Sequence, residues 1–115
     1  MQSETGFWAE DTRADALERE LDTAGDLAFV WEDNGEVVGY ASAHDMGFRA
    51  DLSHLIIAKP YRNRGIGSHL VGHIEAILRD RGCKVLLADV MHDVAGFYHA
   101  LGWSDSDMML VRKRL

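Results

Sequence analysis

The amino-acid sequence predicts an α/β (α+β) domain whose sheet is mixed and mostly antiparallel. Three observations lead to this prediction: a length of 115 residues, an Asn-Gly pair between two β-rich segments, and a strand, a long helix and a strand that follow one another. The length suits one compact domain, which we expect to span residues 1–115. With 47% hydrophobic and 27% charged residues, the composition is that of an ordinary folded protein.

The first half of the chain is expected to hold a helix and a β-hairpin. A capping-box pattern and apolar residues at helical spacing predict a helix over residues 12–23, which Gly25 ends. Residues 27–32 and 36–44 are predicted strands. The pair Asn34-Gly35 between them supplies the positive φ angles of a tight hairpin turn, so we expect these strands to be antiparallel.

The second half is expected to alternate strands with helices. Residues 51–58 are predicted to form a central strand, and a long helix with one apolar stripe begins near Ile66. Residues 84–90 are a predicted strand that a right-handed crossover places parallel to the central one. A short helix over residues 94–101 and a last strand over residues 107–113 complete the expected order.

Composition excludes several classes of protein. A formal net charge of −7 disfavours a nucleic-acid partner. No apolar run approaches the roughly 20 residues that span a bilayer, and residues 1–10 lack the pattern of a signal peptide, so we expect a cytoplasmic protein with no membrane partner. The single Cys83 excludes an internal disulfide. His69 and His73 lack a third ligand, so we expect no metal site.

The charge is divided unevenly along the chain. Residues 1–53 carry thirteen acidic residues and three arginines, whereas residues 54–115 carry nine basic and six acidic residues. One interpretation is that the acidic side chains only solvate a helix face. The other is a site where a polyanionic cofactor meets the basic half and a cationic substrate meets the acidic half.

A glycine-rich segment lies where the central strand is followed by the long helix. Gly65 and Gly67 allow the backbone to approach a ligand at a helix N-terminus, and Arg62 and Arg64 add positive charge beside it. These residues predict a cradle for phosphate groups, although an ordinary glycine-rich loop would have the same composition. The spacing fits neither a P-loop nor a dinucleotide-binding GxGxxG motif.

Three motifs in order resemble the GNAT superfamily of N-acetyltransferases. Arg62-x-x-Gly65-x-Gly67 matches the [RQ]xxGx[GA] signature of its coenzyme A loop. Leu55-x-Ile57 stands where the family has the strand that pairs with pantetheine, and residues 97–103 resemble its FYxxLGF signature. The resemblance covers residues 26–115. It implies a GNAT-like fold with helices on both faces of the sheet.

The resemblance also implies a reaction and a co-substrate. A member of this family would bind acetyl-CoA, use no metal, and transfer the acetyl group to a primary amine by direct attack. The acceptor would be a small-molecule or peptide amine, and the acidic half favours a polyamine, an aminoglycoside or a lysine side chain. The residues expected to bind the coenzyme are Leu55, Ile56, Ile57, Arg62, Asn63, Arg64, Gly65, Ile66, Gly67 and Ser68.

Two residues are candidates for proton transfer. Tyr98 stands where many family members have a tyrosine that protonates the leaving thiolate. Asp51 is the first candidate for the base, acting through water. Strand alternation would place Asp51, Ser53 and Leu55 on one face and His54 on the other, unless a bulge turns His54 inward. His44 and Asp45 are weaker candidates.

Two departures from the family pattern leave an alternative open. Met91 replaces an asparagine that commonly contacts the cofactor, and a strand and helix that family members usually carry at the N-terminus are missing. The chain could therefore be a non-catalytic acyl-CoA-binding module or a regulatory domain. The predicted strand 27–32 would lie at an exposed edge, which a homodimer partner or the pair Phe7-Trp8 could cover.

Overall fold

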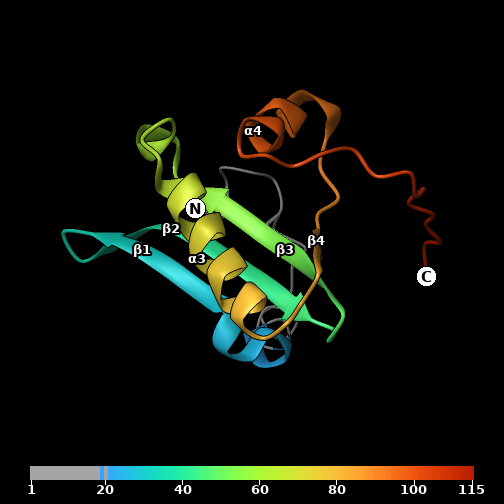
Figure 1. Ribbon diagram of the computed structural model, residues 1–115. Helices are drawn as coiled ribbons and strands as arrows, with labels where there is room; N and C mark the ends of the chain where they lie inside the picture. The colour runs from blue at the N-terminus through green and yellow to red at the C-terminus, as the bar shows by residue number, and fades with distance from the viewer. Residues whose placement is uncertain (1–18, 20) are drawn as a thin grey trace.

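The computed structural model describes residue 19 and residues 21–115 of the chain. Four strands, β1 (Ala28–Asp33), β2 (Glu36–Asp45), β3 (Arg49–Ile57) and β4 (Val85–Leu87), form one sheet in that order. The first three are antiparallel (Figure 1), and β4 pairs with β3 in the parallel direction. The sheet is therefore mixed and mostly antiparallel, as predicted. Of the predicted helix over residues 12–23, residues 12–18 and 20 lie outside the described part.

The β1–β2 hairpin confirms the Asn-Gly prediction. Asn34 has a φ of 53° and Gly35 a φ of 79°, and Asp33 pairs with Glu36 across the turn. Two successive positive φ angles define the turn type whose twist matches that of paired strands. In the described part of the chain, β1 pairs only with β2 and lies at the edge of the sheet.

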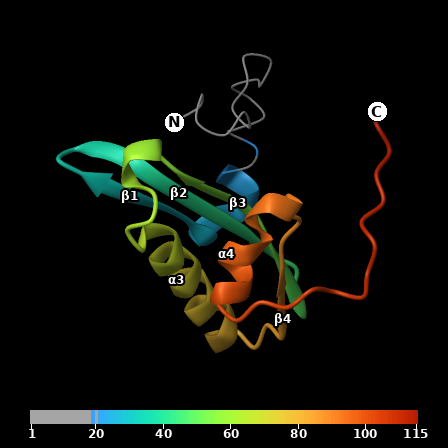
Figure 2. The same cartoon turned by 90° about the horizontal axis from the view of Figure 1, so that it is seen from above.

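Helix α3 (Ile66–Asp80) covers one face of the sheet and closes the core. Its predicted apolar stripe is buried, except that Ile77 is only partly so. The helical turn at residues 21–24 lies on the opposite side of the sheet (Figure 2). Burial of these apolar side chains is the main force that holds α3 on the sheet. The core cluster consists of Leu27, Ala41, Ala43, Ala50, Leu52, Ile66, Leu70, Val71, Ile74 and Leu78.

A β-bulge interrupts the pairing of β2 with β3. Ser42 pairs with His54, but the next residue, Ala43, pairs with Leu52, so Ser53 has no partner in β2. Leu52 and Leu55 both pack against the core on the α3 side. The prediction that Asp51, Ser53 and Leu55 share one face was therefore wrong, because the extra residue changes the alternation.

The C-terminal region departs from the prediction. Strand β4 is shorter than the predicted 84–90, and the predicted strand over residues 107–113 is absent: residues 108–111 are 66–83% exposed. Figure 1 shows this segment running away from the sheet. A strand over residues 107–113 would need a neighbouring strand whose backbone groups accept and donate hydrogen bonds. The edge strand β4 has only three residues and so offers too few such groups. Helix α4 (Ala95–Ala100) lies within the predicted 94–101.

Candidate active site

A cleft opens where β3 and β4 separate. Their pairing stops at Asp51 and Leu87, and beyond it the two segments enclose a cavity of about 340 Å³. The bulge at Ser53 lies at this point. Because a bulge bends and twists the strand that carries it, it accounts for the separation of β3 from β4. The lining residues are Leu52, Ser53, His54, Leu55, Ile56, Ala88, Asp89, Val90, Met91, Val94 and Tyr98.

The second half of β3 has one edge that no described strand covers. Strand β4 pairs only with residues 49–51, so the backbone of residues 52–57 is without a strand partner on that side. Leu55 and Ile56 line the cleft, and the Ile57 carbonyl accepts a hydrogen bond from Arg62 Nε at 2.9 Å. An open strand edge can pair with the amide groups of an extended ligand.

The loop before α3 contains two residues in the left-handed conformation. Asn63 and Gly65 are left-handed, with φ angles of 64° and 83°. Gly65 is the N-cap residue of α3, and no side chain caps the amides of the first turn. Those amides point out of the helix at the positive end of its dipole, where phosphate oxygens bind well. The Arg64 guanidinium lies 5.1 Å from the centre of the Tyr61 ring, beside this loop.

Gly67 joins this loop to α4. A Cβ atom at Gly67 would lie 3.2 Å from Phe97 Cζ and 3.8 Å from Leu55 Cδ2. Glycine therefore lets Phe97 pack closely against the start of α3, and a larger residue would require the Phe97 ring to shift by a few tenths of an ångström. This contact places α4, and with it Tyr98, next to the glycine loop. Phe97 itself remains 39% exposed.

Tyr98 reaches the cleft from α4. Its ring lies between those of Phe97 and Trp103, at centroid distances of 5.0 and 5.1 Å. Burial raises the pKa of the Tyr98 phenol above its ordinary value of 10.0, because an apolar environment disfavours the phenolate. No described residue bonds its hydroxyl group. The phenol is thus neutral near pH 7 and can donate a hydrogen bond into the cleft.

The side chains that bond one another across β2 and β3 lie on the face opposite α3. Asp51 does not line the cleft, whereas Ser53 and His54 do. Ser53 Oγ and His44 Nδ1 form a short hydrogen bond, and Ser42 Oγ lies 3.1 Å from His54 Nδ1. The bulge places the His54 side chain on the same face of the sheet as Ser42 and His44. No sequence pattern indicates these serine–histidine pairs, since cross-strand register decides which side chains meet.

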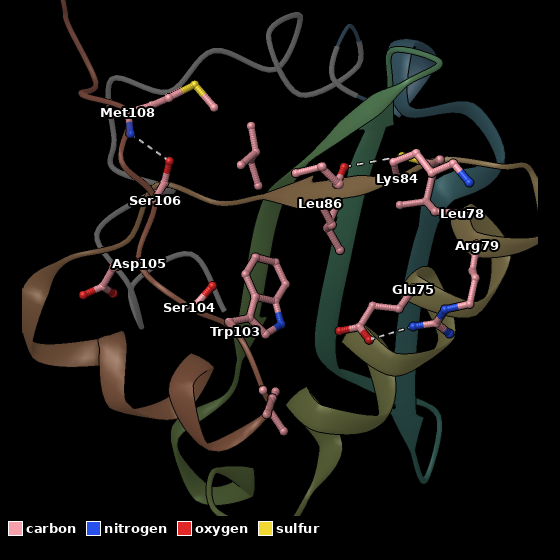
Figure 3. Close-up of a pocket in the computed structure, with 15 residues that line it drawn as sticks. Glu75, Leu78, Arg79, Lys84, Leu86, Trp103, Ser104, Asp105, Ser106 and Met108 are labelled. Carbon is pink, nitrogen blue, oxygen red and sulfur yellow. Dashed lines mark hydrogen bonds and ion pairs between the residues drawn. The ribbon is translucent and has the colours of Figure 1, made fainter.

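A larger cavity lies elsewhere. It has a volume of about 500 Å³ and lies between the C-terminal half of α3, β4 and residues 101–108 (Figure 3). Trp103 stands beside β4 at its wall, and Glu75 and Arg79 of α3 lie opposite. Neither the glycine loop nor Tyr98 lines it. Tyr98 and the open edge of β3 line the smaller cleft, although the glycine loop lines neither cavity, and we therefore take the smaller cleft as the candidate site.

Among residue 19 and residues 21–115, no group of three or more histidine, cysteine, aspartate or glutamate side chains is placed to hold a metal ion. His69 and His73 instead stack edge-on against Trp31 and Phe29 of β1, at 5.0 and 4.6 Å between ring centroids. No helix in this part of the chain has the length and apolar character needed to cross a membrane.

A mixed sheet with a separating parallel strand pair, and a glycine loop at the start of the connecting helix, defines an acetyltransferase fold. The chain belongs to the acetyltransferase (GNAT) family, whose sequence model matches residues 1–103. This family uses acetyl-CoA as its acetyl donor, and the glycine loop, the open edge of β3 and the cleft fit such a donor.

Solved structures of acetyltransferases share the fold. An aminoglycoside acetyltransferase from an uncultured soil metagenomic sample is 16% identical with a TM-score of 0.77, covering 97% of this chain and 82% of that one. A putative acetyltransferase from Deinococcus radiodurans is 24% identical with a TM-score of 0.70, covering 98% and 81%. Aminoglycoside N-acetyltransferase AAC(6')-Iy, in complex with CoA, is 20% identical with a TM-score of 0.70, covering 88% and 85%.

Proposed function

We propose that this protein transfers the acetyl group of acetyl-CoA to a primary amine by direct attack. The observation that carries the proposal is that one cleft joins the open edge of β3 to a neutral tyrosine, with the glycine loop beside it. These features supply what amide formation from a thioester requires: a site for the donor, a group to protonate the leaving thiolate, and space for the amine. The proposal assigns no role to a metal ion.

The donor would lie along β3 with its phosphates at α3. The first-turn amides and the loop residues 62–68 would hold the pyrophosphate, and the backbone of residues 55–57 would pair with pantetheine. This arrangement brings the thioester near Tyr98. Placing donor and acceptor side by side contributes a large part of the rate enhancement in such reactions.

Tyr98 would act as the general acid. A thiolate leaves the tetrahedral intermediate more readily when a proton is supplied to its sulfur, and the half-buried phenol is protonated across the physiological range. Asp51 would act as the base only through a water molecule, because it lies outside the cleft lining.

The proposed acceptor is a cationic amine. The acidic first half favours a cationic amine, and two of the similar structures are aminoglycoside acetyltransferases, so aminoglycosides join polyamines and lysine peptides as candidates. We also propose that residues 1–115 form a single acetyltransferase domain. The cytoplasmic location and the homodimer remain predictions.

A turnover assay tests the proposal. Thiol release from acetyl-CoA would be followed with spermidine, an aminoglycoside and a lysine peptide, using wild type, Tyr98→Phe and the matched control Tyr61→Phe. We expect Tyr98→Phe to lower kcat by about 10²-fold or more with acetyl-CoA binding retained, and Tyr61→Phe to stay near wild type. An unchanged rate in Tyr98→Phe would refute the acid role.

The alternative is a non-catalytic acyl-CoA-binding module. The observation in its favour is Met91, which lines the cleft and is 74% exposed where many family members have a polar asparagine. Tight binding of acetyl-CoA without turnover of any of the three amines would support this alternative.

A further inference from the structure

A chain of hydrogen bonds runs from the helical turn at residues 21–24 through the sheet face to the cleft. Thr23 Oγ1 lies 2.8 Å from His44 Nε2, and His44 Nδ1 forms a short hydrogen bond with Ser53 Oγ. Ser53 lines the cleft that also contains Tyr98. The chain therefore connects an imidazole in the second strand to the space where an amine would meet the thioester.

The direction of each hydrogen bond follows from the single proton of the Thr23 hydroxyl. Thr23 Oγ1 donates to the carbonyl oxygen of Arg19 at 2.9 Å, and a carbonyl oxygen can only accept. The threonine oxygen must then accept from His44 Nε2. A neutral imidazole with its proton on Nε2 has a bare Nδ1, so Nδ1 accepts the hydroxyl proton of Ser53.

The bulge explains why this serine reaches both partners. Ser53 is the residue without a partner in β2, and its position lets its side chain contact His44 while the residue still lines the cleft. Asp51, two residues earlier, is the cross-strand partner of His44 but does not line the cleft. Because the Ser53 hydroxyl donates its proton to His44, its oxygen lone pairs remain able to accept a proton from a group in the cleft.

We propose that Ser53 and His44 form the route by which the acceptor amine loses its proton. This inference rests on the proposed acetyl transfer and deepens it. Ser53 contacts the amine directly or through one water, and His44 is a positioning residue that receives the proton through Ser53. The route takes the place of the water-mediated transfer to Asp51.

The ammonium form of the amine gives one proton to Ser53 as the serine proton moves to His44 Nδ1, and the imidazolium later releases it to solvent. The free amine attacks the thioester carbonyl, which forms a C–N bond. The C–S bond then breaks, the sulfur takes the Tyr98 proton, and the second nitrogen proton restores the phenol. The products are amide, free thiol and one proton.

The kinetic test uses variants of the two residues and a matched histidine control. Ser53→Ala and His44→Gln are expected to lower kcat by about 10²-fold while KM for acetyl-CoA stays within about threefold. Ser53→Thr keeps a hydroxyl and should recover most of the rate. His99→Gln, an exposed histidine of α4 bonded to Asp105, should behave as wild type.

The pH dependence of kcat/KM distinguishes His44 from its acidic neighbours as the group that accepts the proton. Asp51 faces His44 from β3, and Asp45 follows it in the chain. A base that must be neutral loses activity as it becomes protonated, so kcat/KM should fall toward acid pH in wild type. We expect this acid limb to vanish in His44→Gln and to persist in Asp51→Asn. The opposite pattern would overturn the inference in favour of Asp51.

A nitrogen NMR measurement of the histidine side chains tests the hydrogen-bond chain without turnover. We expect His44 to carry its proton on Nε2 and its Nδ1 resonance to shift in Ser53→Ala. A proton on Nδ1 would overturn the inference even in an active enzyme. If the tautomer is as expected but wild type acetylates none of the amines, the proposed function has failed, and the hydrogen-bond chain has no catalytic role.

Discussion

Replacing Gly65 with alanine should destabilise the protein through backbone strain alone. Gly65 has a φ of +83°, and an added Cβ would meet no atom within 4 Å. The left-handed conformation costs an L-residue about 1–2 kcal/mol, and no lost contact adds to this value. We therefore expect Gly65→Ala to lower the free energy of unfolding by about 1–2 kcal/mol.

Gly72 provides a matched control in the same helix. Its Cβ would also meet nothing within 4 Å, but it lies in the interior of α3 without a positive φ. Alanine there removes the helix-destabilising freedom of glycine, so Gly72→Ala should raise the free energy of unfolding by about 0.5–1 kcal/mol. The same substitution thus has opposite signs at the two positions.

Thermal and urea unfolding would measure both variants. About 1 kcal/mol changes the Tm of a domain of this size by roughly 4 °C, so the two variants should differ by about 6–12 °C. The acetyl-CoA affinity of Gly65→Ala should also fall, since strain in the loop displaces the first-turn amides. A Tm of Gly65→Ala at or above that of wild type would refute the left-handed loop.

Other predictions concern pH, the core and the C-terminal segment. Burial raises the pKa of Tyr98 in the folded state, so this contribution to stability is present below pH 10 and is lost as pH rises further. The free energy of unfolding should therefore decrease less between pH 8 and 11 in Tyr98→Phe than in wild type. Ile74 is fully buried, so Ile74→Ala should cost about 2–5 kcal/mol in urea unfolding, and a loss below about 1 kcal/mol would contradict its place in the core. Deleting residues 108–115 should change the free energy of unfolding by less than about 1 kcal/mol, because they are largely exposed; a Tm decrease of several degrees would show that they pack as the predicted strand.

Local patterns predicted those parts of the fold that local interactions determine. The Asn34-Gly35 turn, the apolar stripe of α3 and the crossover to β4 follow from turn chemistry, helical periodicity and handedness. Residues 107–113 have the composition of a strand but not its structure, because strand formation requires a partner edge. Propensity does not supply that edge.

The candidate site was predicted in part. Motif spacing located Tyr98 and the glycine loop, since both depend on residues close together in sequence. The partnership of Ser53 with His44 depends on one extra residue in β3, which shifts the register between two strands. No alternation pattern shows such a shift, so Asp51 was the natural candidate and the serine–histidine pair was missed.

The most direct test of the account is a calorimetric titration of the folded protein with acetyl-CoA, with desulfo-CoA and ATP as controls. We predict one acetyl-CoA bound per chain with a Kd in the micromolar range, about −8 kcal/mol, and much weaker binding of ATP. Weaker acetyl-CoA binding by Gly65→Ala than by Gly72→Ala would locate the site at the α3 loop. No binding of acetyl-CoA by folded wild type would contradict the cradle and the proposed acetyl transfer together.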